Sequence, residues 1–195
     1  MSRYDPRTAL LVVDVQNDFA DPQGSLHIPG GDEVVDVVNA EIDRAREHDA
    51  PVLYTQDWHP PRTPHFDIDG GSWPVHCVRE TWGAQLHPDL RVEGPVVQKG
   101  VDGGDGYSGF SVRDPESGEE SATRLGSLLE QAGVRRVVVT GLAGDVCVKA
   151  TALDARELGY DVVLPLAATR FVDPDEGQRR TIEESEAAGV TVEAS

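Results

Sequence analysis

The sequence predicts an α/β protein, with a three-layer α/β/α architecture in which a central, mostly parallel sheet of six strands lies between two layers of helices. Short continuous runs of valine and leucine alternate along the chain with longer segments of helical periodicity. Continuous apolar runs are typical of strands that helices bury on both faces. Glycine follows several helical segments, as in Gln131-Ala132-Gly133 and Glu157-Leu158-Gly159, and is a common residue just past the end of a helix.

The expected elements can be placed along the chain. Six apolar runs are candidate strands, at residues 9–13, 52–55, 96–98, 137–140, 162–164 and 190–192. Four segments are candidate helices, at residues 33–48, 122–132, 146–158 and 176–188. A length of 195 residues suits one globular domain, so we expect a single domain over residues 1–195.

One long segment, residues 56–93, interrupts this alternation. It is rich in Pro, His, Trp and Gly and shows no clear period. Loops of this length in a compact domain are usually functional. The segment contains His59, His65 and His76, so we expect part of the functional site to lie in it.

Composition limits the classes of partner. The chain has 17 basic and 35 acidic residues, a formal net charge of −18. Such a surface repels phosphate backbones and anionic membranes, so we expect neither nucleic acid nor a membrane as a partner. No apolar run approaches a membrane span, and the N-terminal residues lack the apolar stretch of a secretory signal. Two cysteines do not make a disulfide framework, so we expect a cytoplasmic protein with reduced thiols.

Cys147 is the candidate nucleophile. It follows the predicted strand at 137–140 and the turn Gly141-Leu142-Ala143-Gly144, at the start of the predicted helix 146–158. The positive end of a helix dipole favours a thiolate, and the backbone N–H groups of the turn could bind an oxyanion. Most cysteines are small core residues, and this alternative applies to Cys147 as well. Its position at a predicted helix start favours covalent acyl transfer.

Other polar residues follow the predicted strands at the same edge. Asp14, Lys99 and the pair Asp57 and His59 come directly after apolar runs, and the carboxyl ends of parallel strands form a common ligand-binding edge. Asp14 can take the thiol proton and return it to a leaving amine. We expect Lys99 to keep Asp14 ionised and to lower the pKa of Cys147. The alternative is that Asp14 makes a local cap and that Lys99 is solvated.

Asp57-Trp58-His59 predicts a metal site. Its carboxylate and imidazole, with one more imidazole, form a set that suits a divalent transition metal with open positions. His65 and His76 are both available as the further ligand. An isolated Asp-x-His is a weak signal, because a single histidine is usually a packed or surface residue.

In combination these residues match a known family. The chain resembles the nicotinamidases, within the isochorismatase-like cysteine hydrolases, over essentially its whole length. The strand-end Asp, Lys and Cys mark the superfamily, and Asp-x-His with a later Trp-Pro-x-His-Cys marks the nicotinamidase branch. The matching segments are Val13-Asp14-Val15-Gln16-Asn17-Asp18-Phe19, Gly24-Ser25-Leu26, Gln56-Asp57-Trp58-His59-Pro60, Trp73-Pro74-Val75-His76-Cys77-Val78, Gln98-Lys99-Gly100, Tyr107-Ser108-Gly109-Phe110 and Gly141-Leu142-Ala143-Gly144-Asp145-Val146-Cys147-Val148.

The resemblance implies the isochorismatase-like hydrolase fold and a role for each matching residue. Asp14, Lys99 and Cys147 match the catalytic triad. One divalent metal ion, Zn, Fe or Mn, is implied on Asp57, His59 and His76, and His65 matches a ligand found in some members. The substrate-binding residues that it implies are Phe19, Trp73, Tyr107 and Leu142. It also implies a cis peptide bond at Leu142-Ala143 and an oxyanion hole made by the amides of Ala143 and Cys147.

The implied activity is hydrolysis of nicotinamide, and also of pyrazinamide, through a thioester on Cys147. It belongs to NAD salvage. An alternative within the superfamily is hydrolysis of a small ureido or carbamoyl amide, for which the metal site has no obvious role. A binding module would require the triad to be vestigial. A homo-oligomer is compatible with the sequence. Gly144 departs from the family pattern, because many relatives have Thr there, and we expect glycine to loosen the oxyanion turn or to change its support.

Overall fold

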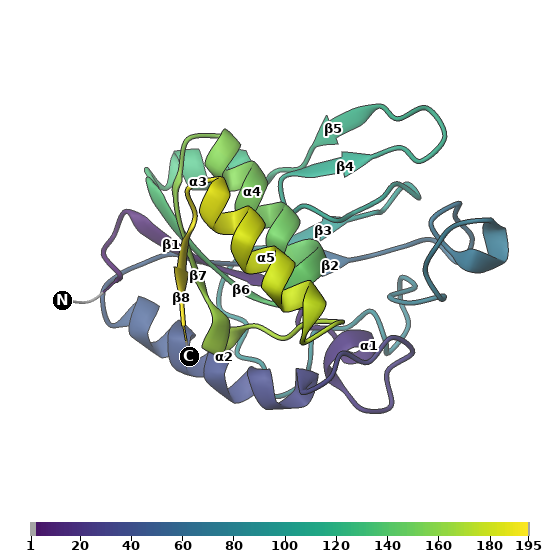
Figure 1. Ribbon diagram of the computed structural model, residues 1–195, viewed down its shortest axis with the longest axis horizontal. Helices are drawn as coiled ribbons and strands as arrows, with labels where there is room; N and C mark the ends of the chain where they lie inside the picture. Colours follow the sequence, from purple (N-terminus) through teal and green to yellow (C-terminus); the bar gives the residue numbers. More distant parts are fainter. Residues whose placement is uncertain (1–2, 195) are drawn as a thin grey trace.

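The computed structural model describes residues 3–194, and its centre is a six-stranded sheet in the order β3-β2-β1-β6-β7-β8 (Figure 1). Every neighbouring pair in this sheet is parallel. The predicted fold class is therefore confirmed, and each predicted apolar run forms one strand. The strands are β1 Thr8–Val13, β2 Val52–Asp57, β3 Val96–Lys99, β6 Arg136–Gly141, β7 Asp161–Pro165 and β8 Thr191–Glu193.

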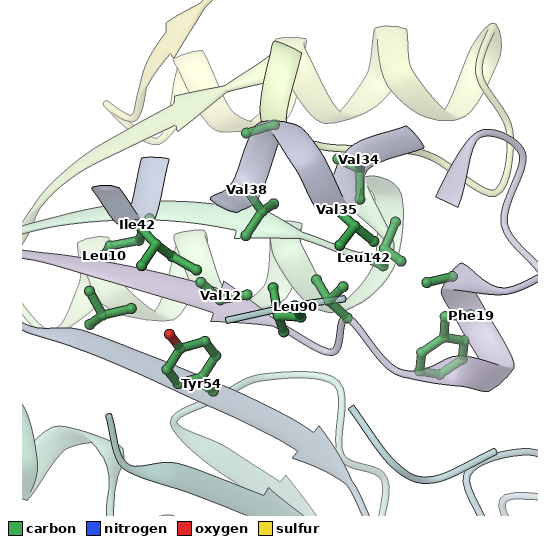
Figure 2. Packing of buried hydrophobic residues seen from close by; sticks show 14 of the residues in the cluster. Leu10, Val12, Phe19, Val34, Val35, Val38, Ile42, Tyr54, Leu90 and Leu142 are labelled. Atoms are coloured by element: carbon green, nitrogen blue, oxygen red, sulfur yellow. The ribbon is translucent and has the colours of Figure 1, made fainter. Parts of the chain in front are cut away.

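Helices cover both faces of the sheet, and side chains of β1 alternate between the two resulting cores. Leu10 and Val12 point to the face covered by α2, Gly31–Arg46, where Val38 and Ile42 pack against them (Figure 2). Ala9, Leu11 and Val13 of β1, with alternate residues of β6, pack on the other face against α3 and α4, Leu125–Gln131 and Lys149–Glu157. The last helix, α5 at Glu176–Ala187, lies beside α4 (Figure 1).

The helices begin and end close to the predicted positions, with one difference at the site. The predicted helix 146–158 divides into a π-helical turn, Gly144–Val148, and α4. Cys147 therefore lies inside an irregular turn rather than in the first turn of an α-helix. The elements without a sequence signal are all short: α1 Asn17–Ala20, β4 Ser111–Arg113, β5 Glu120–Ala122, and the 3-10 turns Asp67–Asp69 and Leu166–Ala168.

The long loop connects β2 to β3 and extends beyond the carboxyl end of β2 (Figure 1). Backbone hydrogen bonds fold it onto itself. The His59 N–H donates to the Cys77 carbonyl at 3.0 Å, and the Arg79 N–H donates to the His59 carbonyl at 2.8 Å. These bonds hold the middle of the loop against its beginning, next to the carboxyl end of β2. Within residues 3–194, none of the helices combines the length and the apolar character that a membrane crossing requires.

Candidate active site

The carboxyl edge of the sheet brings together the four strand-end residues that the sequence singled out. Asp14 directly follows β1, Asp57 ends β2, Lys99 ends β3, and Cys147 lies in the turn after β6. Asp57 and Lys99 are register partners. The Lys99 Nζ lies 2.7 Å from Asp14 Oδ2, 2.5 Å from Asp57 Oδ1 and 3.8 Å from Cys147 Sγ. The expected convergence at one edge is therefore observed.

Lys99 is a buried cation at the centre of this cluster. Its ammonium group forms an ion pair with Asp14 and donates hydrogen bonds to the Asp57 carboxylate, the Gly106 carbonyl and the Cys147 sulfur. Burial alone would lower the pKa of Lys99, but the two carboxylates hold it well above its usual value. Lys99 is therefore charged at neutral pH, and the alternative that it is solvated is wrong because its side chain is buried.

Asp14 is a buried carboxylate with two different partners. Lys99 pairs with one of its oxygens, and the Thr55 hydroxyl donates to the other at 2.7 Å. Burial raises the pKa of Asp14 to about 6, against the opposing effect of the Lys99 charge. The group is therefore ionised at neutral pH and has a proton affinity suited to a general base.

The Cys147 thiol differs from the expectation for a helix-start cysteine. Burial raises the pKa of Cys147 well above its usual value, and the Lys99 charge opposes this only in part. The nearby carboxylates of Asp14 and Asp57 also raise it. Lys99 therefore lowers the pKa of Cys147 as predicted, but the net shift is upward, so the expectation that the helix start favours a resting thiolate was wrong. The resting group is a neutral thiol that hydrogen-bonds to Asp14, so its proton must leave during nucleophilic attack.

The turn before Cys147 presents free backbone donors. The peptide bond between Leu142 and Ala143 is cis, as the resemblance implies. The Ala143 carbonyl accepts the N–H groups of Val146 and Val148, at 3.1 and 3.0 Å. Within residues 3–194, the Ala143 amide donates no backbone hydrogen bond, nor does the Cys147 amide outside its own helical turn. These two amides are therefore the candidate donors to an oxyanion at this turn.

Three histidines of the long loop converge beside Asp57. The ring nitrogens of His59, His65 and His76 approach one another to within 4.8 Å, and the His59 Nε2 lies 3.8 Å from Asp57 Oδ2. Both ring nitrogens of His59 are buried without a hydrogen-bond partner. Burial lowers the pKa of His59 to about 4 and also lowers that of His76, so these imidazoles are neutral, the form that binds metal.

Outer hydrogen bonds orient the other two imidazoles. The His76 Nδ1 contacts the Pro74 carbonyl at 2.6 Å, and the His65 Nδ1 contacts Asp105 Oδ1 at 2.6 Å. Each contact leaves Nε2 for a metal, which is the usual arrangement around a metal-bound histidine. Imidazoles with unpartnered nitrogens beside a carboxylate fit a divalent transition metal. His65 therefore lies with the candidate ligands rather than apart from them.

Two residues that contact the site, Asp105 and Thr55, were not predicted from the sequence. Asp105 lies in the glycine-rich stretch before Tyr107, where no periodic pattern indicates which side chains point inward. Thr55 lies inside β2, where threonine is an ordinary strand residue. Its position two residues before Asp57 on a fully buried strand is the one signal that could have indicated it.

An apolar pocket joins the cysteine to the histidines. Trp73 and Tyr107 form one wall, with the Trp73 Nε1 donating to the Tyr107 hydroxyl at 3.0 Å. Leu142, expected in the pocket, lies fully buried in the core on the α2 side instead (Figure 2). The residues that line the pocket are Phe19, Leu26, Ile28, Asp57, His65, Trp73, His76, Gly106, Tyr107, Ala143, Val146, Cys147 and Val172.

Comparisons with known proteins show which family the chain is similar to. The isochorismatase domain model matches residues 8–195. The nicotinamidase of Escherichia coli (strain K12) is 38% identical, over 96% of this chain and 94% of its own length.

Two solved structures are also similar. PnC1 from L. infantum in complex with nicotinate has a TM-score of 0.88 and 39% identity, over 97% of this chain and 93% of that chain. The pyrazinamidase of Pyrococcus horikoshii in complex with zinc has a TM-score of 0.86 and 37% identity, over 97% and 100%. The chain therefore belongs to the isochorismatase family.

Proposed function

We propose that this protein is a metal-dependent cysteine amidohydrolase that converts nicotinamide into nicotinate and ammonia, and that also accepts pyrazinamide. The observation that carries the proposal is one pocket with aromatic walls, lined by Cys147 and by His65 and His76. A flat ring with a nitrogen on one side and a carboxamide on the other matches these two chemistries. The named activities of the relatives support the same substrate class. Such an activity recycles nicotinamide for NAD salvage.

Asp57, His59, His65 and His76 would hold the metal ion, which we expect to be zinc, iron or manganese. The chemistry that such an ion supplies when bound is acceptance of the lone pair of the pyridine nitrogen. Phe19, Trp73 and Tyr107 would enclose the ring and exclude water. The substrate carboxamide is then oriented toward Cys147.

Acylation begins with attack by the Cys147 sulfur on the carboxamide carbon. As the S–C bond forms, the thiol proton passes to Asp14 and the carbonyl electron pair moves onto oxygen. The amides of Ala143 and Cys147 would donate to this oxyanion, and one such donor contributes about 3 kcal/mol to transition-state stabilisation. Lys99 stays protonated and stabilises the negative charges of the cluster.

Collapse of the tetrahedral intermediate breaks the C–N bond. Asp14 gives its proton to the nitrogen, ammonia leaves, and a nicotinoyl thioester remains on Cys147. A water molecule then gives a proton to Asp14 and attacks the thioester carbon. Nicotinic acid forms as the S–C bond breaks, the proton returns from Asp14 to the sulfur, and the acid releases its remaining proton to solvent and leaves as nicotinate. A ureido or carbamoyl substrate would use the same triad but would leave the histidine cluster without a role.

The test is ammonia release by the purified, metal-loaded protein from a panel of amides. Nicotinamide and pyrazinamide are expected to be hydrolysed rapidly. Benzamide has the same size and carboxamide but no ring nitrogen, so it serves as the matched control and is expected to react at least about 100-fold more slowly. Hydrolysis of a ureido or carbamoyl compound, with none of nicotinamide, would contradict the proposal.

A further inference from the structure

A short segment, residues 170–173, packs against the oxyanion turn, residues 143–147. The Gly144 N–H donates to the Arg170 carbonyl at 2.7 Å. The Asp145 carboxylate accepts the backbone N–H groups of Val172 and Asp173 at 2.9 and 3.0 Å. The turn is therefore tied to this segment by hydrogen bonds in both directions.

The Phe171 ring fills the space beside Gly144. A Cβ atom added to Gly144 would stand 2.5 Å from Phe171 Cδ1 and 2.8 Å from Cζ, closer than non-bonded carbon atoms approach. Gly144 has no left-handed φ, so its backbone conformation does not itself require glycine. The ring makes glycine necessary, and Phe171 is only 4% exposed. Of the two expected effects of Gly144, the structure favours the second, a change of support, because an aromatic ring occupies the volume beside the turn.

We propose that Phe171 is a positioning residue for the reaction: through Gly144, it fixes the amides of Ala143 and Cys147 at the distance that an oxyanion requires. The inference rests on the proposed function, since it concerns the oxyanion of that chemistry. Ala143 is adjacent to Gly144 in the chain, and Cys147 lies in the same π-helical turn. A displacement of Gly144 therefore moves both donors.

The expected loss of kcat follows from how strongly turnover depends on the position of the oxyanion donors. Without the ring, Gly144 can move into the vacated space. Its remaining restraints include its hydrogen bond to Arg170, the Lys149 N–H that donates to its carbonyl, and the Asp145 contacts. A misplacement of about 1 Å reduces turnover by about 100-fold. Such a shift affects the transition state, which carries the oxyanion, far more than the bound amide, so we expect it to lower kcat and leave KM nearly unchanged.

Val172 offers a contrast within the same segment. Its side chain lines the pocket and is 39% exposed, so it touches the region that the ring of the substrate would occupy. Val172→Ala removes apolar contact made equally in the ground and transition states. We expect this variant to raise KM and leave kcat within about twofold.

The experiment compares Phe171→Ala, Gly144→Thr and the double variant in the metal-loaded enzyme. We expect Phe171→Ala to lower kcat by about 10- to 100-fold. Gly144→Thr alone should be at least as damaging, because its side chain meets the ring. In the double variant the threonine refills part of the space that the ring leaves, so kcat should recover by at least about fivefold over either single variant. Phe171→Leu should lie between wild type and Phe171→Ala.

Two further readouts separate positioning from loss of stability. Ile42→Ala truncates an equally buried side chain of α2 and should lower the melting temperature without changing kcat. Nicotinaldehyde adds to the thiol as a tetrahedral thiohemiacetal, its oxygen taking the place of the oxyanion. Phe171→Ala should weaken nicotinaldehyde binding in proportion to kcat and leave the affinity for nicotinate unchanged.

The result that would overturn the inference is a folded Phe171→Ala enzyme with kcat within twofold of wild type. A double variant whose kcat is no higher than that of the single variants would also overturn the inference. This outcome still decides the matter where Gly144→Thr alone fails to fold. The wild-type enzyme is measured first. If it binds nicotinaldehyde on Cys147 but hydrolyses no nicotinamide, the proposed function fails, while the ratio of aldehyde affinities between variants still decides the role of Phe171.

Discussion

One carboxylate, that of Asp57, joins the buried lysine to the histidine cluster: its Oδ1 lies 2.5 Å from Lys99 Nζ and its Oδ2 lies 3.8 Å from His59 Nε2. The pKa of Asp57 is lowered by the Lys99 charge despite burial, so the carboxylate stays ionised. The proposed triad and the proposed metal site are therefore one electrostatic unit. Changes to either part should affect the other.

Removing the buried cation should be costly. Lys99→Met leaves the carboxylates of Asp14 and Asp57 buried without their partner, and losing one member of a buried ion pair costs about 3–5 kcal/mol. We expect the free energy of unfolding in urea to fall by that amount. The control is Lys149→Met, because Lys149 pairs with Glu184 at 2.9 Å near the surface, where such a pair contributes at most about 1 kcal/mol. Equal losses in the two variants would contradict the assignment.

The acid limb of the pH profile should follow Asp14. Because burial raises its pKa to about 6, Asp14 is ionised above that pH and can accept the thiol proton. Below it the group is protonated, so kcat/KM should fall about tenfold for each unit of acidification. The measurement is kcat/KM for nicotinamide against pH, with folding followed by circular dichroism. A flat profile through pH 5 in a folded enzyme would mean that another group accepts the proton.

Asp105 should contribute to metal affinity although it is not a proposed ligand. It holds the His65 Nδ1 at 2.6 Å, and loss of such an outer hydrogen bond typically weakens metal binding by about 10- to 100-fold. We expect Asp105→Ala to lower the affinity for zinc by this factor in competition with a chelator. Asp102→Ala removes an exposed carboxylate of the same loop and is the matched control. Equal zinc affinity in the two variants would argue against His65 as a ligand.

Cys147 should behave as a thiol in the free enzyme. Its pKa is raised well above the usual value by burial, so alkylation by iodoacetamide should be slow at neutral pH and should accelerate as the pH rises. Cys147→Ala measures the background labelling, which should be low because the other cysteine, Cys77, is fully buried and also has a raised pKa. Rapid alkylation that is independent of pH above neutrality would show a resting thiolate.

The sequence predicts the sheet and the convergence of its strand-end residues, because both follow from apolar runs and from parallel topology. Asp14, Asp57, Lys99 and Cys147 each lie at or after a strand end, so one rule of topology places all of them. The histidines were indicated by their residue type in a long loop, and the structure adds that all three converge.

The features that could not be predicted depend on contacts between distant segments. The protonation state of Cys147 is set by burial and by carboxylates from other strands, which the local helix signal does not report. Leu142 points into the core because of the backbone path of the turn. Asp105 reaches His65 from a glycine-rich loop, and Phe171 meets Gly144 from a segment 27 residues further along the chain. None of these pairings leaves a periodic pattern.

The most direct test of covalent catalysis is to trap the acyl-enzyme during turnover of nicotinamide. Hydroxylamine attacks thioesters, so the wild-type enzyme should form nicotinohydroxamate at the expense of nicotinate, in amounts that rise with hydroxylamine concentration. Each molecule of hydroxamate should accompany one molecule of ammonia, and Cys147→Ala should form neither product. Steady release of ammonia and nicotinate with no hydroxamate at any hydroxylamine concentration would mean that water attacks the amide directly, and would contradict a thioester on Cys147.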